Sequence, residues 1–231
     1  MDDEQHQTIK QYTTWLDKGD IYTQHFRFVL SPLARPLLHP PLARMARRLD
    51  IGPGDRVLDV GCGRGSVLEY IRHTVPLDLA PVGVDVTHAL LGMARRTFLG
   101  SDGKNGWAPH LSRASSTYLP FPGEVFDVVL CSYMVKHLND DDTRRMAAEV
   151  CRVLRPGGRF LIWEFAPSRL DLLTRLYRRV FSVEVKAVYL RHHQELAPLV
   201  ARGGFRDVRR FPLGPTLYPP IPRVGVLAVK G

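Results

Sequence analysis

Two carboxylates and a run of alternating glycines could together bind a ligand. Residues 57–65 read Val-Leu-Asp-Val-Gly-Cys-Gly-Arg-Gly, in which Asp59 stands two positions before the first glycine. Glycine permits positive φ angles and lets a ligand come close to the backbone. A second acid, Asp85, follows the glycines by about 20 residues, a distance at which a carboxylate can accept the hydroxyls of a ribose. This spacing predicts a site for an adenosine-type cofactor.

The elements that hold these groups can be predicted from the apolar runs around them. Residues 57–60 and 82–86 are short apolar runs typical of buried parallel strands, and each carries an acid near its end. Apolar residues at helical spacing follow both runs, so each strand is expected to lead into a helix. A glycine turn at a helix N-terminus is a common binding site for ligand groups. The alternatives are a tight turn without a ligand and, for Asp85, a cap on the next helix.

Further apolar runs could complete one sheet. Strands are predicted over residues 126–131 and 159–163, directly after Gly203–Gly204, and over residues 223–231. A helix is expected over residues 140–154, closed by the turn at Arg155–Gly158. Residues 99–110 carry three glycines and no apolar period, which predicts a surface loop.

The glycine spacing separates two kinds of cofactor site. A nicotinamide or flavin fingerprint has the spacing G-x-G-x-x-G, whereas here the third glycine, Gly65, comes one residue early and Ser66 takes its place. With Asp59 before it, this turn resembles motif I of the class I S-adenosylmethionine-dependent methyltransferases, where it approaches the amino acid end of the cofactor. The segments FDVVLCSYMVKHL and LRPGGRFLIWE are similar to the fourth-strand and fifth-strand regions of the same family. In the family's order, these motifs cover residues 51–165.

The resemblance implies a fold, a division of the chain and an activity. The expected fold is an α/β, Rossmann-like sheet of seven mostly parallel strands, with an antiparallel last strand and helices on both faces. Residues 1–231 are expected to form a single domain, with a helical lid over 1–50, a cofactor-binding core over 51–165, and a substrate-side helix and closing hairpin over 166–231. The expected activity moves a methyl group from S-adenosyl-L-methionine to an O, N or C atom of a small or lipid-like acceptor and leaves S-adenosyl-L-homocysteine.

The resemblance also implies which residues contact the cofactor. Asp59 is expected to meet its ammonium group, and Asp85 its ribose hydroxyls. The pair Ser115–Ser116 stands where many relatives have an acid and an alanine, and serine can hydrogen-bond the adenine amine without supplying charge. Tyr12 and Tyr22, from the aromatic N-terminal segment, could touch the ligands or simply pack. The predicted cofactor contacts are Asp59, Gly61, Cys62, Gly63, Gly65, Asp85, Val86, Ser115, Ser116, Ser132 and Tyr22.

One histidine stands where a proton acceptor would be needed. His137 follows the strand predicted over 126–131, at the rim of the sheet where the acceptor should lie. Its imidazole, titrating near neutral pH, is the first candidate for a general base. Tyr133 and the pair His192–His193 are further candidates. The alternative is an ordinary packing histidine, and an amine or thiolate acceptor would need no base. We find no Ser/His/Asp arrangement and no metal-ligand spacing.

Charge bears on the partners of the chain. The formal net charge is +9, and residues 169–210 hold ten basic and four acidic residues. Such a segment could meet nucleic acid, anionic headgroups or an acidic substrate, or form a solvated surface. An amphipathic helix expected over about 168–181 could pack on its own domain or rest on a membrane surface. Nucleic acid is the less favoured partner, because CSYMVKH lacks the Asn/Asp-Pro-Pro-Tyr/Phe sequence typical of amino-methylating nucleic-acid enzymes.

Composition bears on the compartment. The chain has no run of about 18 apolar residues and therefore no expected membrane span. Its polar N-terminus is unlike a secretory signal, and its three cysteines lack CxxC spacing, which predicts reduced thiols in a cytoplasmic protein. Two alternatives to small-molecule methylation stay open: an RNA or protein methyltransferase, and an S-adenosylmethionine-binding protein with a non-methylating role.

Overall fold

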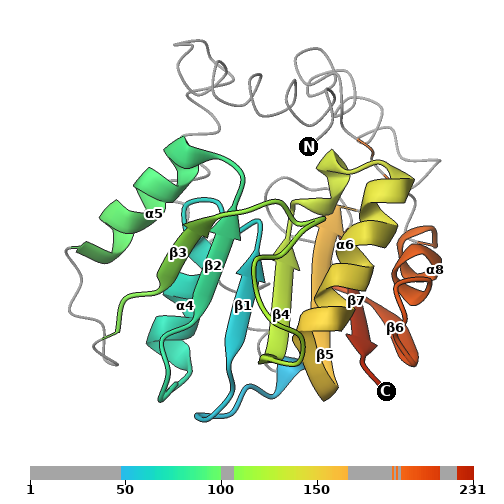
Figure 1. Ribbon diagram of the computed structural model, residues 1–231, viewed down its shortest axis with the longest axis horizontal. Helices are drawn as coiled ribbons and strands as arrows, with labels where there is room; N and C mark the ends of the chain where they lie inside the picture. Colours follow the sequence, from blue (N-terminus) through green and yellow to red (C-terminus); the bar gives the residue numbers. More distant parts are fainter. Residues whose placement is uncertain (1–47, 100–106, 166–188, 190, 192–193, 214–222) are drawn as a thin grey trace.

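One seven-stranded sheet organises the described part of the chain (Figure 1). The computed structural model describes residues 48–99, 107–165, 189, 191, 194–213 and 223–231. The strands are β1 (Val57–Val60), β2 (Val82–Asp85), β3 (His110–Arg113), β4 (Phe126–Ser132), β5 (Leu154–Phe165), β6 (Asp207–Pro212) and β7 (Arg223–Val229). The helices are α4 (Ser66–Thr74), α5 (His88–Leu99), α6 (Asp140–Val153) and α8 (Leu196–Ala201), with one short 3₁₀ helix, η2 (Val135–His137).

The strand order confirms the predicted fold class. The order is β3-β2-β1-β4-β5-β7-β6, and β1 to β5 pair in parallel. Strand β7 runs antiparallel to both of its neighbours, β5 and β6. The chain moves outward from β1 to β2 and β3, and then returns to place β4 on the other side of β1. Ligands of open α/β sheets bind at such a switch point, outside the carboxyl ends of the strands. The topology therefore predicts a ligand site at the carboxyl ends of β1, β2 and β4.

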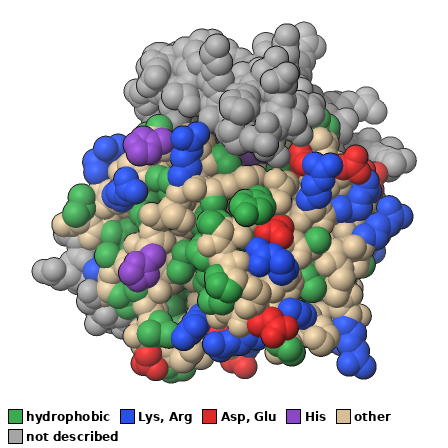
Figure 2. Space-filling model, in the orientation of Figure 1, with side chains coloured by type: hydrophobic (Ala, Val, Ile, Leu, Met, Phe, Trp, Pro, Cys, Tyr) green, Lys and Arg blue, Asp and Glu red, His purple; other side chains and the backbone are tan. Residues whose placement is uncertain are grey.

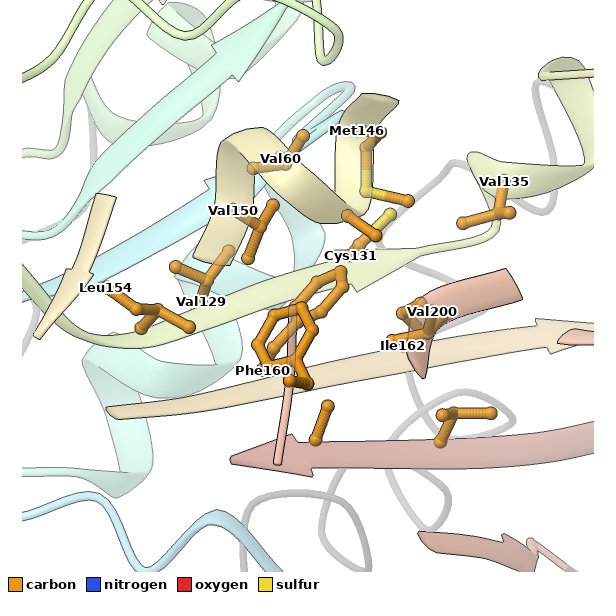
Figure 3. Close-up of a cluster of buried hydrophobic side chains, with 14 of the residues drawn as sticks. Val60, Val129, Cys131, Val135, Met146, Val150, Leu154, Phe160, Ile162 and Val200 are labelled. Carbon is orange, nitrogen blue, oxygen red and sulfur yellow. The ribbon is translucent and has the colours of Figure 1, made fainter. Parts of the chain in front are cut away.

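Strand β4 supplies side chains to both hydrophobic layers of the fold. Val129 and Cys131 lie in one buried cluster with residues of α6 and α8, among them Val150 and Val200 (Figure 3). The alternate residues of β4, 128 and 130, lie in a second cluster that includes residues of α4. Alternation of this kind is what a strand buried on both faces requires. Helices therefore cover both faces of the sheet, as predicted.

Helix α6 begins at the predicted residue, Asp140, and ends at Val153, one residue before the predicted Leu154. The side chain of Asn139 accepts a hydrogen bond from the backbone N–H of Asp142, which caps the first turn. Three aspartates occupy that first turn and Arg152 the last, so the charges complement the helix dipole. A glycine at 203 lets α8 pack closely, because a Cβ there would come within 2.6 Å of the Cβ of Ala147.

Two predicted segments, a loop and a turn, have the wrong boundaries. His110, assigned to a surface loop, is the first residue of β3, and Leu99, at the other end of that loop, still belongs to α5. The turn predicted at Arg155–Gly158 lies inside β5, which begins at Leu154. A register shift against β4 accommodates the extra residues, and Gly157 takes a φ of 75° there. The sequence Pro-Gly-Gly is typical both of a bulge within a strand and of a turn that precedes a strand, so the sequence does not distinguish the two.

Several predictions fall outside the described residues. These are the N-terminal lid with Tyr12 and Tyr22, the helix over 168–181, the pair His192–His193, and most of the basic segment 169–210. The described Lys and Arg side chains on the face drawn in Figure 2 are spread over several parts of it. All three cysteines are free of disulfides. Among the described residues, no helix has the length and apolar character needed to cross a bilayer.

Candidate functional site

The glycine turn after β1 is fixed against the end of β2. The backbone N–H groups of Gly61 and Cys62 both donate to the carbonyl of Val84, at 2.8 and 3.0 Å. Gly65 closes the turn by donating to the carbonyl of Cys62 at 2.8 Å, and α4 begins at the next residue. The three glycines have φ angles of 74°, 53° and 84°, in the region that favours glycine. The prediction that this turn needs glycine for its backbone is confirmed.

The three glycines differ in what surrounds them. A Cβ at Gly61 would lie 2.5 Å from Cγ of Met134, and a Cβ at Gly65 would lie 2.9 Å from the ring of Phe98. These two glycines therefore allow the η2 segment and α5 to pack on the turn. At Gly63 no atom of the described residues lies within 4 Å of such a Cβ. Gly63 is thus the glycine that leaves room for a ligand against the backbone.

Asp59 is a buried carboxylate whose charge is not compensated by the described residues. Its exposed fraction is 0%, and within the described part of the structure neither carboxylate oxygen has a hydrogen-bond partner. Burial, followed by the nearby charge of Asp85, raises the pKa of Asp59 to about 7. A buried carboxylate of this kind is well suited to binding a cationic group of a ligand, because a positive partner would offset the free-energy cost of burying its charge.

Asp85 ends β2 beside the glycine turn. Its Oδ2 accepts the N–H of Gly63 at 2.9 Å and its Oδ1 accepts the N–H of Thr87 at 2.8 Å, just before α5. Burial raises the pKa of Asp85, and the hydrogen bonds from Thr87 and Gly63 oppose that rise. A carboxylate has about four acceptor positions, so each oxygen can take one further donor. Support for the start of α5 and binding of a diol are therefore compatible roles.

The remaining predicted contacts lie just after β1 and β2 or at the end of β4. The side chain of Cys62 lies in a buried cluster with Leu68 and Phe98, and its N–H is bonded to Val84, so only its backbone carbonyl is left for a ligand. Val86 is half-buried, and its carbonyl accepts the Nε of Arg113 at 3.0 Å. Ser132 is the last residue of β4, two positions before the methionine that covers Gly61.

The two serines lie at the next strand end. The backbone N–H of Ala114 donates to the carbonyl of Asp85 at 3.2 Å, which brings the segment after β3 to the end of β2. The hydroxyl of Ser115 is 2.9 Å from that of Thr117 and accepts the N–H of the same residue at 3.3 Å. Ser115 therefore stabilises its own turn, and half-buried Ser116 is the freer of the pair to meet a ligand.

His137 closes the 3₁₀ helix that follows β4. Its backbone N–H donates to the carbonyl of Met134 at 2.9 Å, and its side chain is partly buried. Burial, with the ammonium of Lys136 as a second cause, holds the pKa of His137 well below its usual value of 6.5. The expectation that this imidazole titrates near neutral pH is therefore wrong. At pH 7 it is neutral and able to accept a proton, although as a weaker base.

A buried ionic and aromatic cluster lies beside His137 and was not predicted from the sequence. Glu164, at the end of β5, accepts the backbone N–H of Lys136 at 3.1 Å, and its carboxylate lies 3.9 Å from the ammonium of that lysine. The ring of Tyr133 lies 4.8 Å from that of Trp163 and 4.5 Å from that of Phe165, between centroids. Tyr133 has a φ of 53°, which an ordered neighbourhood must hold in place. Only an acid inside an apolar strand, at Glu164, hinted at this cluster.

The raised pKa of Asp59 leads to a prediction about stability. A pKa above the unfolded value of 3.8 means that the folded chain favours the protonated form, so its stabilising contribution is present below pH 3.8 and is lost as pH rises to about 7. Asp59→Asn should therefore raise the melting temperature of the ligand-free protein at pH 8 by several degrees, and by much less at pH 4.

The measurement is thermal unfolding of wild type and variant at both pH values. Asp207→Asn, at a partly exposed carboxylate on β6, serves as the control and should show no comparable gain at pH 8. A loss of stability for Asp59→Asn at pH 8, or a gain equal at both pH values, would contradict the burial argument.

Comparison with known proteins yields a family match and structural neighbours. Residues 57–158 match a family model described as "Methyltransferase domain". A Geobacter sulfurreducens protein, the ubiquinone/menaquinone biosynthesis C-methyltransferase UbiE, is 34% identical over 134 residues, covering 56% of this chain and 47% of that protein. The chain thus spans about half the length of the curated relatives it matches.

Solved structures agree on the fold. Phosphoethanolamine N-methyltransferase 2 of Haemonchus contortus, in complex with S-adenosyl-L-methionine, matches with a TM-score of 0.65 at 18% identity, covering 83% of this chain and 52% of that one. The cyclase SpnF matches with a TM-score of 0.65 at 15% identity, covering 82% and 79%. At these identities the likeness concerns the fold alone.

Proposed function

We propose that this chain, which carries a class I S-adenosylmethionine-dependent methyltransferase domain, binds S-adenosyl-L-methionine and moves its methyl group to a small-molecule acceptor. The observation that carries the proposal is the pair Asp59 and Asp85 around the glycine turn. One carboxylate is buried without a partner among the described residues, and the other is fixed by the turn itself. S-adenosyl-L-methionine brings an ammonium group, a ribose diol and a methyl group already activated on a sulfonium.

Each part of the site has a proposed role toward the cofactor. Asp59 receives the ammonium group, which turns a buried, unpaired charge into a paired one. Asp85 accepts the ribose hydroxyls through the acceptor positions that Gly63 and Thr87 leave open. Gly63 offers its open backbone to the ligand, and Ser116 meets the adenine. Val86, Ser132, Tyr22 and the backbone of Cys62 complete the proposed set.

We further propose that the acceptor is an apolar, hydroxylated aromatic molecule such as a reduced quinone precursor. The name of the Geobacter relative supports this class, as does the aromatic character of the cluster at Tyr133, Trp163 and Phe165. A ring hydroxyl must lose its proton before an adjacent carbon or the oxygen becomes a strong nucleophile. His137, neutral at pH 7, takes that proton in our proposal.

A non-methylating role on the same cofactor site is the alternative that a specific observation favours. The cyclase SpnF has a similar fold, so the fold does not by itself fix the reaction. The two candidates separate in an assay with methyl-labelled S-adenosyl-L-methionine and 1,4-dihydroxynaphthalene carrying a short isoprenoid chain. Label in the organic extract supports methyl transfer. Cofactor binding without label transfer to this probe or to a cell extract would favour the alternative.

Cofactor choice gives a direct test of the proposed site. The full chain should bind S-adenosyl-L-methionine and S-adenosyl-L-homocysteine in calorimetry and should not bind NAD, because the glycine spacing and Asp59 suit an amino acid group rather than a pyrophosphate. Gly63→Val, which adds a side chain on the open side of the turn and strains its φ of 53°, should weaken both binding reactions, whereas Gly157→Val, at an open glycine of β5 with a φ of 75°, should not. Tight NAD binding with no response to S-adenosyl-L-methionine would overturn the proposal.

A further inference from the structure

Arg191 makes an unusual set of hydrogen bonds around the 3₁₀ helix that carries His137. Its Nη1 donates to the carbonyl of Val135 at 3.1 Å, and its Nη2 donates to the carbonyl of Leu138 at 2.7 Å. The same guanidinium binds Oδ1 of Asp140 through Nε and Nη2, at 3.0 and 2.9 Å. One side chain thus bridges both sides of His137 to the first residue of α6.

Two further hydrogen bonds hold the same 3₁₀ helix through the backbone of Lys136. Glu164 of β5 accepts the backbone N–H of Lys136, and the carbonyl of that lysine accepts the N–H of Tyr189 at 2.6 Å. The last carbonyls of a short helix have no partner within it and must find one elsewhere. The carbonyls of Lys136 and Leu138 take their partners from residues 189 and 191, more than 50 positions further along the chain. Arg191 also adds a second donor to the carbonyl of Val135, which already accepts the N–H of Leu138.

We infer that Arg191 is a positioning residue that fixes the orientation of His137 for proton transfer, an inference that rests on the proposed function. The side chain of Arg191 is only 10% exposed, so its four hydrogen bonds form with little competition from water. Hydrogen bonds to a charged donor of this kind are among the stronger ones in proteins. Nothing in these contacts brings Arg191 to the acceptor itself, and its effect passes through the backbone of η2.

The shape of the guanidinium explains why arginine stands here. Its planar fork presents donors in several fixed directions, whereas a lysine ammonium is a compact group on a flexible stem. A lysine at this position could keep the contact with Asp140 but would not reach both carbonyls at the same time. A methionine would keep the aliphatic stem and make none of these hydrogen bonds. The two replacements therefore separate charge from geometry.

The kinetic test uses the full chain with S-adenosyl-L-methionine and the isoprenylated 1,4-dihydroxynaphthalene as acceptor. Arg191→Met should lower kcat by about 10- to 100-fold and leave cofactor affinity within threefold, and Arg191→Lys should recover part of the loss. In a His137→Ala background, Arg191→Met should cost less than threefold more, because groups that act as a unit are not additive. Arg209→Met, at an exposed arginine of β6 paired with Asp207, is the matched control.

A second readout needs neither cofactor nor acceptor. In nuclear magnetic resonance spectra of histidine-labelled protein, the signal absent from His137→Ala identifies the imidazole of His137. Arg191→Met should shift its titration midpoint toward 6.5, and Arg209→Met should leave it in place. Full additivity in the double variant, or an unchanged midpoint in folded Arg191→Met, overturns the inference. If the wild type is inactive but Arg191→Met still shifts the titration midpoint of His137, the result counts against the proposed function. The contact by which Arg191 positions His137 would then still be supported.

Discussion

Replacing His137 by alanine should lower turnover on the hydroxylated aromatic probe by about 10²–10⁴-fold, the usual contribution of a positioned general base. Cofactor affinity should stay within threefold, because His137 is not among the proposed cofactor contacts. The measurement combines steady-state kinetics with calorimetry on the same preparation. The matched control is His110→Ala, at an exposed histidine in the first position of β3, paired with the beginning of β2.

The pH profile makes this expectation sharper. A base acts in its neutral form, and burial beside Lys136 holds the pKa of His137 well below 6.5. Activity that depends on His137 should therefore be level across the neutral range and fall only when pH drops through that lowered pKa. A variant with near-wild-type turnover, or an acid limb in the wild-type profile that His137→Ala leaves unchanged, would demote His137 to a packing residue.

Removal of the Asp85 carboxylate should weaken cofactor binding at least tenfold. Hydrogen bonds to an ionised acceptor contribute roughly 1.5–3 kcal/mol each, and Asp85→Ala would remove two of them from the ribose. The variant also leaves the N–H groups of Gly63 and Thr87 without their acceptor, so part of the loss would come from a less ordered turn. Calorimetry with S-adenosyl-L-homocysteine measures the sum of both effects.

A companion variant separates those effects. Asp85→Asn keeps one acceptor oxygen for Thr87 but loses the charge, so its affinity should fall between wild type and Asp85→Ala. Melting curves of the ligand-free proteins report the contribution to the turn alone. If a folded Asp85→Ala binds S-adenosyl-L-homocysteine as tightly as the wild type, Asp85 is only a support for α5.

The sequence was sufficient to predict the parts of the fold that depend on local pattern. Strands β1, β2 and β4 are mostly apolar with one aspartate each, and the alternating glycines between β1 and α4 are typical of a turn with positive φ angles. Strand β3 was missed because His-Leu-Ser-Arg has one apolar residue and exposed ends. An edge strand does not need the apolar run that marks a strand buried on both faces.

The chemistry of the site was less predictable than its position. The spacing indicated Asp59 and His137 as site residues. Burial raises the pKa of Asp59 and lowers that of His137, and burial depends on parts of the chain that are distant in sequence. The contacts of Arg191 and Glu164 with η2 span more than 25 positions along the chain and leave no periodic signal. Single arginines and glutamates of this kind are indistinguishable from surface residues until the fold is known.

The place of β4 in both hydrophobic clusters has a consequence for how the protein responds to ligands. Its alternate residues join the two layers of the core, and its carboxyl end leads directly into the segment that covers Gly61 and carries His137. Layers that share such a strand should unfold as one cooperative unit rather than separately. A ligand that binds only the folded protein stabilises it by mass action, and both layers gain this stability because they unfold together. A cofactor bound at one end of β4 would therefore protect amides as far away as α8, with no change of conformation there.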